Sequence, residues 1–339
     1  MNISIIGSGG WGTALAVLLE KNDHKVCMWS YDRDECKGLE LYRENRPFLP
    51  GIAIGEGVRF SNDLSEAAQS GVIITSTPSA FMLPVARALK PFIDGQLIVN
   101  VSKGFIKIDE RYVSIAEMLA DTLCTERVSV LTGPSHAEEV GRGAPTVCVA
   151  ASRCKADAEL IQDIFMCGNF RVYSTPDIVG AELGGSLKNV IALAAGICDG
   201  MGLGDNAKAA LMTRGLTEMA RLGVAMGGRS ETFAGLTGIG DLIVTCNSVH
   251  SRNRRAGILI GEGTLPGDAV RQIGTVEGYY AAEAAAALSE EYNVDMPIAR
   301  TVYSILYAGK KPGDAIRDLM TRAPKHEIEE TWMADIKWP

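Results

Sequence analysis

The sequence lacks the clustered cysteine and histidine ligands that a metal site needs. Its eight cysteines are spread through apolar segments, none forms a C-x-x-C pair, and the chain has only four histidines. Metal sites built from such residues use short, repeated ligand spacings. We therefore expect no metal site, and thiols scattered in this way are typical of buried cysteines in a reducing cytoplasm.

The chain also lacks a positive net charge and a long apolar run. A formal net charge of −8 argues against a general nucleic-acid binder, which is usually basic. No apolar run approaches the roughly 20 residues that span a bilayer, and the best candidate, residues 189–198, sits inside a helical pattern. The first strand is expected by Ile3, which leaves no room for a signal peptide. We expect a cytoplasmic protein that does not insert into a membrane.

The composition, with 47% hydrophobic and 22% charged residues over 339 positions, is that of a globular protein long enough for two domains. In the first half, short β-branched runs alternate with helical patterns such as Thr13–Lys21 and Phe81–Leu89. The runs are apolar on both faces, as in parallel strands buried between helix layers. The expected strands are Ile3–Ile6, Val26–Trp29, Val72–Thr75, Leu97–Val101, Val128–Leu131 and Thr146–Val149.

After about Pro176 helical patterns dominate. The expected helices are Ile178–Gly200, Asn206–Met226, Ala281–Tyr292, Ile298–Ala308 and Pro312–Met320. The sequence therefore predicts an α/β fold class. A Rossmann-type doubly wound sheet occupies residues 1–176, and an all-α domain occupies residues 177–339.

The stretch G7-S-G-G-W-G12 matches the dinucleotide-binding pattern G-x-G-x-x-G. Gly7 would permit the tight turn, Gly9 the close approach of a pyrophosphate, and Gly12 the packing of helix on strand. The pyrophosphate would lie at the N-terminus of a helix beginning near Thr13. Gly10 and Trp11 fill the variable positions, and Trp11 lies beside the cofactor or packs on a neighbouring loop.

The end of the second expected strand, W29-S-Y-D-R33, should meet the ribose. Asp32 could accept hydrogen bonds from the ribose hydroxyls, which favours NAD. Arg33 could pair with a 2′-phosphate, which favours NADP, or simply lie in solvent. The sequence leaves the cofactor preference open.

Lys188 lies off the apolar stripe of its expected helix, on a face with Gly184 and Gly185. Adjacent glycines inside a helix cost about 1 kcal/mol each relative to alanine, so something must come close to them. That neighbour is another helix, or a cofactor and substrate that face Lys188. The competing interpretation is a solvated lysine.

The segment H250-S-R-N-R-R255 concentrates positive charge in an acidic protein. Guanidinium groups bind phosphate oxygens through paired hydrogen bonds, so the segment indicates an anionic substrate. The spacing alone slightly favours the alternative, a solvated basic helix end.

Taken together, these segments resemble the bacterial glycerol-3-phosphate dehydrogenases that use NAD or NADP, over nearly the whole chain. The motifs that carry the resemblance are G7-S-G-G-W-G12, V101-S-K-G104, L131-T-G-P-S-H-A-E-E139, L183-G-G-S-L-K-N-V190, G238-I-G-D-L242, S251-R-N-R-R255 and V276-E-G278. Three positions depart from the family pattern: Gly10, Tyr31 and Thr275. The departure at Tyr31, where the family often has Arg or His, weakens the case for NADP.

The resemblance implies a role for each matching residue. Lys188 would be the catalytic lysine, with Asn189 in the same motif. The implied substrate contacts are Lys103, Gly133, Ser135, Lys188, Asp241, Ser251, Arg252 and Asn253. With the glycine loop and the second-strand end, the cofactor contacts are Gly7, Gly9, Gly10, Trp11, Gly12, Tyr31, Asp32, Arg33, Lys103, Ala137, Arg252, Thr275 and Glu277.

The reaction that the resemblance implies is reversible hydride transfer between dihydroxyacetone phosphate and sn-glycerol 3-phosphate, which supplies phospholipid synthesis. Lys188 would donate a proton in reduction and accept one in oxidation. The resemblance also implies a homodimer. Two alternatives stay open: another Rossmann dehydrogenase with a catalytic lysine, of the 6-phosphogluconate or 3-hydroxyacid type, and a nucleotide-binding regulator without turnover. The latter need not keep Lys103, Lys188 and Asp241 together.

Overall fold

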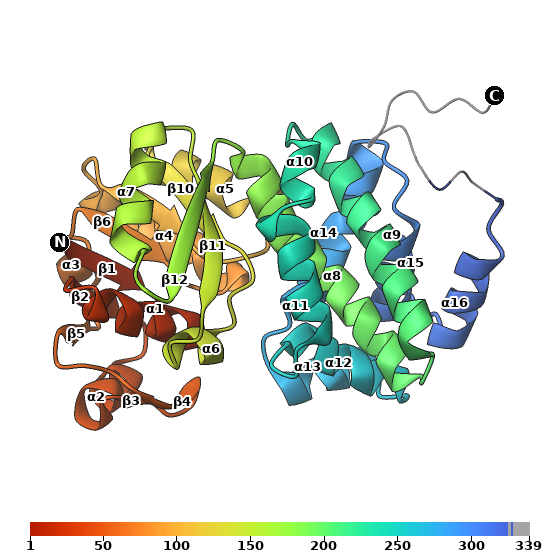
Figure 1. Ribbon diagram of the computed structural model, residues 1–339, viewed down its shortest axis with the longest axis horizontal. Helices are drawn as coiled ribbons and strands as arrows, with labels where there is room; N and C mark the ends of the chain where they lie inside the picture. Colours follow the sequence, from red (N-terminus) through yellow and green to blue (C-terminus); the bar gives the residue numbers. More distant parts are fainter. Residues whose placement is uncertain (325–326, 328–339) are drawn as a thin grey trace. The chain divides into compact units, whose positions relative to one another are not determined.

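The computed structural model describes residues 1–324 and 327. Its chain forms two compact units, Met1–Ile178 and a second that begins at Val179. The first unit alternates strands and helices, and the described part of the second is built from helices (Figure 1). The predicted fold class, a Rossmann-type sheet followed by a helical domain, is confirmed.

The first unit contains a large sheet, two hairpins and short connecting helices. Its strands are β1 (Asn2–Ile6), β2 (Lys25–Trp29), β3 (Glu44–Asn45), β4 (Leu49–Ala53), β5 (Val58–Ser61), β6 (Val72–Thr75), β7 (Leu97–Asn100), β8 (Phe105–Ile108), β9 (Arg111–Ser114), β10 (Val128–Thr132), β11 (Thr146–Ala151) and β12 (Phe170–Thr175). Its helices are α1 (Gly10–Lys21), α2 (Arg33–Tyr42), α3 (Leu64–Ala67), α4 (Ser79–Leu89), α5 (Ile115–Leu123), α6 (Ala137–Gly141) and α7 (Lys155–Phe165), with a 3-10 turn at Lys90–Phe92.

The large sheet has eight strands in the order β12-β11-β10-β7-β6-β1-β2-β5. The chain winds outward from β1 to β2 and β5, then returns to β6 on the other side of β1. The order of a doubly wound sheet reverses at such a point, and ligands bind at the carboxyl ends of the strands beside it. The glycine loop leaves β1 there.

The sheet is not parallel throughout, which corrects the sequence-based expectation. β10 and β11 pair antiparallel, whereas the other neighbours in the sheet run parallel. The connection between β10 and β11 carries only the five-residue α6. A parallel crossover usually carries a full helix that packs on the sheet, and α6 is too short for this, so the connection suits an antiparallel return.

Both edge strands, β5 and β12, are absent from the strands expected from the sequence. The expected strands are runs that are apolar on both faces, which is the pattern of central parallel strands. In β12, Phe170 and Val172 are buried whereas Arg171 and Tyr173 are exposed. An edge strand covered on one face has this alternating pattern, which differs from a run that is apolar on both faces.

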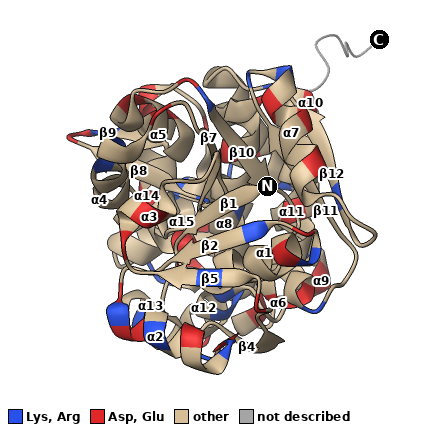
Figure 2. Ribbon diagram, turned by 90° about the vertical axis from the view of Figure 1, so that its left-hand side faces the viewer, with Lys and Arg blue, Asp and Glu red and all other residues tan. Residues whose placement is uncertain are grey.

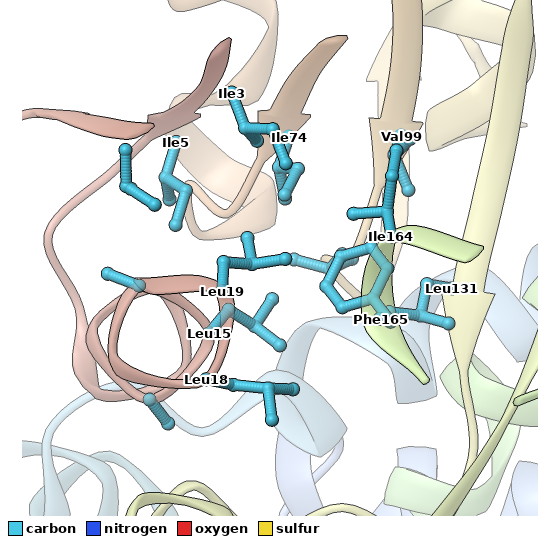
Figure 3. Close-up of a cluster of buried hydrophobic side chains, with 14 of the residues drawn as sticks. Ile3, Ile5, Leu15, Leu18, Leu19, Ile74, Val99, Leu131, Ile164 and Phe165 are labelled. Carbon is cyan, nitrogen blue, oxygen red and sulfur yellow. The ribbon is translucent and has the colours of Figure 1, made fainter. Parts of the chain in front are cut away.

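One hydrophobic core of the first unit lies between the sheet and helices α1 and α7. Figure 3 shows Leu15 and Leu19 of α1 packed beneath Ile5 and Ile74 of the central strands, beside Phe165 at the end of α7. These five side chains are fully buried. The packing fixes α1 directly after β1, which sets the geometry of the glycine loop.

The second unit is helical over its described residues. Its elements are α8 (Ile178–Gly200), α9 (Gly204–Ala225), α10 (Ser230–Phe233), the π-helical turn η2 (Leu236–Gly240), α11 (Asp241–Asn247), α12 (Arg252–Gly261), α13 (Pro266–Ile273), α14 (Glu277–Glu291), α15 (Pro297–Tyr307) and α16 (Pro312–Met320). The predicted helices at 178–200 and 312–320 match α8 and α16, and the short helices α10 to α13 were missed.

Helix α8 forms the centre of this unit. Among the described residues it is the one helix long and apolar enough to cross a membrane, and 94% of its apolar window is buried inside the protein. The apolar stretch within it, residues 189–198, was predicted to be too short to span a bilayer, but the whole of α8 has 23 residues. Burial, not length, identifies it as a core helix.

Candidate functional site

The glycine loop has the geometry that its pattern predicts. Gly7 has a φ of +119°, and a Cβ there would lie 2.8 Å from the Ser76 carbonyl oxygen. A Cβ at Gly12 would overlap the Gly7 carbonyl oxygen, whereas one at Gly9 would meet nothing within 4 Å. Thus Gly7 and Gly12 are required by close backbone packing, and Gly9 leaves open space at the turn.

Helix α1 begins at Gly10, not near Thr13 as predicted, so its first turn contains Gly10, Trp11 and Gly12. No side chain caps this N-terminus. Its first-turn N–H groups lack intrahelical acceptors and, with the helix dipole, favour an anion. The side-chain amide of Asn45 supports the loop by donating to the Ser8 carbonyl oxygen at 2.7 Å and to Thr13 Oγ1 at 2.7 Å. These residues fit the pyrophosphate of a dinucleotide.

Trp11 packs against the hydrophobic core of the first unit. This contact supports the packing interpretation of Trp11. Ala137, the first residue of α6, lies beside the loop, because a Cβ at Gly10 would sit 3.8 Å from the Ala137 Cβ. The structure therefore brings Ala137 to the glycines although it follows them by more than a hundred residues.

Tyr31, Asp32 and Arg33 are exposed at the end of β2 and the start of α2. Asp32 caps α2, because its Oδ1 accepts from the backbone N–H groups of Asp34 at 2.7 Å and Glu35 at 2.9 Å. These backbone hydrogen bonds, from Glu35 first, hold the pKa of the Asp32 carboxyl below its usual range. Figure 2 shows acidic and basic residues side by side on α2. The acidic signal for NAD and the basic signal for NADP therefore both remain.

Three predicted substrate residues converge on one carbonyl group at the carboxyl ends of β7 and β10. The Gly133 carbonyl oxygen accepts from Lys103 Nζ at 3.2 Å and from Ser135 Oγ at 3.0 Å. Gly133 has a φ of +141°, and a Cβ there would lie 3.2 Å from the Val147 carbonyl oxygen. The turn therefore requires glycine and places a cation and a hydroxyl together.

In the helical unit, Lys188 is buried, with 5% of its surface exposed. Its Nζ donates to Asp241 Oδ1 at 2.7 Å and to Thr245 Oγ1 at 2.5 Å. The interpretation of Lys188 as a solvated lysine is wrong. A Cβ at Gly184 would overlap the Thr237 carbonyl oxygen, so the helical glycine admits the η2 turn that leads directly into Asp241.

Two opposing effects act on the charge of Lys188. Burial among small residues favours the neutral amine, whereas the Asp241 carboxylate at 2.7 Å favours the ammonium. Burial raises the pKa of the Cys246 thiol, next to Thr245 in α11, to about 12, so this cysteine is a protonated packing group.

Thr245 is the site residue that sequence reasoning missed. Its hydroxyl donates to the Asp241 carbonyl oxygen at 2.6 Å and thereby turns its oxygen toward Lys188. The available signal was the spacing of four between Asp241 and Thr245, which places both on one face of a helix.

The arginine segment separates into different environments. Ser251 caps α12 by accepting from the Arg254 backbone N–H at 3.2 Å. Arg254 Nε donates to Asp199 Oδ2 at 2.6 Å, whereas Arg252 and Arg255 are exposed. Only the exposed pair matches the expectation of a solvent-facing basic group, and Arg254 is a structural ion-pair partner.

The remaining predicted residues lie around the start of α14. Glu277 is its first residue, although this helix was predicted to begin at Ala281. Thr275 is exposed just before it. Asn253 is buried and bonded to Asn189, the neighbour of Lys188. Residues from four segments of the helical unit are thus gathered around α8.

The first unit has a glycine turn at the switch point of a doubly wound sheet, and the helical unit has a buried lysine–carboxylate pair. These two features define the class of dinucleotide-dependent dehydrogenases. No group of three or more His, Cys, Asp or Glu side chains suited to a metal occurs in residues 1–324 and 327.

Comparison with known proteins identifies the family. Residues 2–158 match the N-terminal family of NAD-dependent glycerol-3-phosphate dehydrogenase and residues 177–317 match its C-terminal family. The chain belongs to the NAD-dependent glycerol-3-phosphate dehydrogenase family.

Relatives and a solved structure match nearly the whole chain. A glycerol-3-phosphate dehydrogenase [NAD(P)+] of Fusobacterium nucleatum is 47% identical over 97% of this chain and 99% of its own. The Bacillus subtilis enzyme of the same name is 46% identical over 97% of this chain and 96% of its own. The crystal structure of glycerol-3-phosphate dehydrogenase from Coxiella burnetii, 37% identical, superposes with a TM-score of 0.90 over 95% of this chain and 99% of that one.

Proposed function

We propose that this protein catalyses the reversible, NAD(P)H-dependent reduction of dihydroxyacetone phosphate to sn-glycerol 3-phosphate. Its family membership supports this reaction over that of a 6-phosphogluconate or 3-hydroxyacid dehydrogenase. The observation that carries the proposal is Lys188, buried and held between Asp241 Oδ1 at 2.7 Å and Thr245 Oγ1 at 2.5 Å. A regulator without turnover does not require a proton donor at this position, whereas the reduction of a ketone does.

The chemistry follows from the position of this ammonium group. The bound nicotinamide supplies the hydride. In reduction, negative charge develops on the substrate carbonyl oxygen, and Lys188 stabilises that oxygen and donates a proton to it. In oxidation, Lys188 as the neutral amine accepts the hydroxyl proton. Asp241 and Thr245 orient Nζ, and Asp241 stabilises the ammonium before the proton is given up.

The two units divide the work in this proposal. The first, predicted as residues 1–176, binds the dinucleotide through the glycine loop, Ala137 and the 31–33 segment. The second, predicted as residues 177–339, supplies the catalytic lysine. As the resemblance implies, the cations Lys103 and Arg252 neutralise the phosphate of the substrate or of the cofactor. Lys103 Nζ lies 3.2 Å from the Gly133 carbonyl oxygen, and Arg252 is exposed. The substrate contacts are completed by Gly133, Ser135 and Ser251, and the cofactor contacts by Thr275 and Glu277. The resemblance adds Asn253 to the substrate contacts.

The setting of the enzyme is also a proposal. We infer a cytoplasmic homodimer that supplies sn-glycerol 3-phosphate for phospholipid synthesis. These inferences rest on resemblance to the family, on the burial of α8 inside the helical unit and on thiols without disulfide partners.

Steady-state kinetics test the proposal. We expect dihydroxyacetone phosphate to be reduced with NADH or NADPH at a kcat/KM in the usual enzymatic range of about 10⁴–10⁸ M⁻¹s⁻¹. The panel includes 6-phosphogluconate and a 3-hydroxyacid in the oxidation direction. Equal or better turnover of either of these would overturn the assignment, and cofactor binding without any turnover would establish the regulator instead.

A further inference from the structure

A chain of buried hydrogen bonds joins three segments of the helical unit through the side-chain amide of Asn253. Its Nδ2 donates to Asn189 Oδ1 at 2.9 Å, and its Oδ1 accepts from the backbone N–H of Gly278 at 2.8 Å. Asn189 is 4% and Asn253 8% exposed. Both ends of one amide are therefore engaged inside the protein, where a broken hydrogen bond is costly.

Each member of this chain is the immediate neighbour of a candidate site residue. Asn189 follows Lys188, Asn253 follows Arg252, and Gly278 follows Glu277. The three pairs come from α8, α12 and the start of α14, respectively. The hydrogen bonds thus set the positions of the three candidate residues relative to one another.

Asn253 also caps α14 from another helix. The residue before α14 is Val276, whose side chain cannot cap it. The Asn253 Oδ1 takes the N–H of Gly278, a first-turn donor with no acceptor inside α14. The same construction occurs at α15, where the buried Glu218 accepts from the Ile298 N–H at 2.7 Å. Loss of the cap would release the helix end that carries Glu277.

Gly278 is shaped for this contact. A Cβ there would overlap the Asn189 carbonyl oxygen and would lie 3.0 Å from Asn253 Oδ1. The α14 backbone therefore lies directly against α8 and the Asn253 amide, and a larger residue could not keep both contacts.

We propose that Asn253 is a positioning residue that holds Arg252 and Glu277 in register with Lys188. This inference rests on the proposed function, in which Arg252 and Glu277 contact the cofactor. Resemblance had assigned Asn253 a substrate contact. A positioning role has a different consequence, because cofactor affinity then depends on Asn253 even when no substrate is present.

The experiment compares Asn253→Ala with Asn253→Asp by titrating NADH and NADPH fluorescence without substrate. The alanine variant loses both hydrogen bonds, and we expect a Kd about tenfold weaker, or about 1.4 kcal/mol. The aspartate variant keeps an oxygen that accepts from Gly278 but loses the donor to Asn189 Oδ1, so we expect its Kd to lie between those of the alanine variant and the original protein. Direct substrate contact alone predicts no change in either cofactor Kd.

Asp199→Asn is the control, because it removes the carboxylate that holds Arg254 of α12 at 2.6 Å and Lys208 of α9 at 3.0 Å, and so breaks another polar contact of α12 with α8. We expect it to lower thermal stability while the cofactor Kd stays within about twofold. A Kd in the Asp199 variant as weak as that of Asn253→Ala would overturn the proposal, since general loosening of α12 would then explain both.

Amide hydrogen exchange gives a second readout in case the alanine variant folds poorly. We expect the Gly278 N–H to exchange at least about tenfold faster in Asn253→Ala, or in Asn253→Ser, than in the aspartate variant. Equal exchange in all of them would contradict the capping role. These assays contain no substrate, so a failure of dihydroxyacetone phosphate turnover is distinguishable from a failure of this proposal.

Discussion

The glycine loop of the first unit and the Lys188 site of the second use different chemical groups. The loop uses backbone groups, namely the N–H groups at the start of α1 that have no intrahelical acceptor. It also contains three glycines, two of which permit close backbone packing. The Lys188 site uses buried side chains, namely a cation, a carboxylate, a hydroxyl and two amides. The first kind of site depends on the absence of side-chain atoms, whereas the second depends on which side chains are present.

The difference follows from the two tasks. A pyrophosphate carries the same charge in every step of the reaction, so fixed backbone dipoles suffice to hold it. A proton donor must change its charge during the reaction, and this requires a titratable side chain in a tuned environment. We therefore expect the two units to respond differently to substitution and to pH.

The largest effect should come from Lys188→Met, which removes the acid and leaves the buried Asp241 without its cation. We expect kcat to fall by about 10²–10⁴-fold and the free energy of unfolding to fall by roughly 3–5 kcal/mol. Adding Asp241→Asn should recover most of the stability but none of the activity. Urea unfolding and dihydroxyacetone phosphate reduction measure the two separately; equal stability of the single and double variants would show that the pair does not stabilise the helical unit.

A pH dependence of stability should arise in the helical unit from Glu218. Burial raises the pKa of this carboxyl to about 7, against the opposing hydrogen bonds from Ile298 and Ala299. The folded state therefore holds the proton more tightly than the unfolded state, and stability falls as pH rises from about 5 to about 8. At 1.36 kcal/mol per unit, we expect roughly 3 kcal/mol across this window.

Urea unfolding of Glu218→Gln at several pH values checks this prediction. The glutamine cannot ionise, so its stability relative to the original protein should improve as the pH rises. Exposed Glu290→Gln on α14 serves as the control and should leave the pH dependence unchanged. Parallel curves for the Glu218 variant and the original protein would refute the assignment.

The backbone character of the glycine loop is tested by two alanine substitutions. Gly12→Ala places a Cβ against the Gly7 carbonyl oxygen, and we expect a loss of about 1–3 kcal/mol of stability and weaker cofactor binding. Gly9→Ala has ordinary backbone angles and no neighbour within 4 Å. We expect unchanged stability but a cofactor Kd about tenfold weaker, because the methyl group occupies the space left for the pyrophosphate. Unaltered binding by Gly9→Ala would place the pyrophosphate elsewhere.

The smallest expected effect concerns Arg33→Ala at the exposed start of α2. If this guanidinium meets a 2′-phosphate, the KM for NADPH should rise about fivefold while that for NADH stays constant, as fits a solvent-exposed ion pair of about 1 kcal/mol. Arg46→Ala, an exposed residue beyond α2, is the control. Equal changes for both cofactors would remove Arg33 from cofactor selection.

Much of the fold could be predicted because its signals are local. Residues 72–75 and 178–200 were predicted as the strand and helix that the structure contains, since a buried central element is apolar on all sides. The edge strands β5 and β12 were missed, and so was the antiparallel step between β10 and β11, because strand order and direction depend on which distant segments pair.

The candidate site likewise has a part that local sequence signals predict and a part that depends on distant segments. The glycine loop was found from spacing, because its chemistry lies within one turn of chain. Thr245 was missed, and the solvated alternative for Lys188 stayed open, because the partners of Lys188 come from another helix. The arginines illustrate the same limit: neighbouring residues of equal charge include a partly buried ion-pair partner, Arg254, and two exposed groups.

By itself, the sequence determined where the backbone can turn and approach: glycines at 7, 9 and 12, a helix at 178–200 and a lysine on its small-residue face. These properties are local, since torsional freedom and side-chain size belong to each residue. Only the tertiary structure decided that α8 is a core helix, that Lys188 is paired with Asp241 and Thr245, and that Asn253 holds the start of α14. The environment of a charge or an amide depends on the atoms around it, and those atoms come from residues far away in the chain.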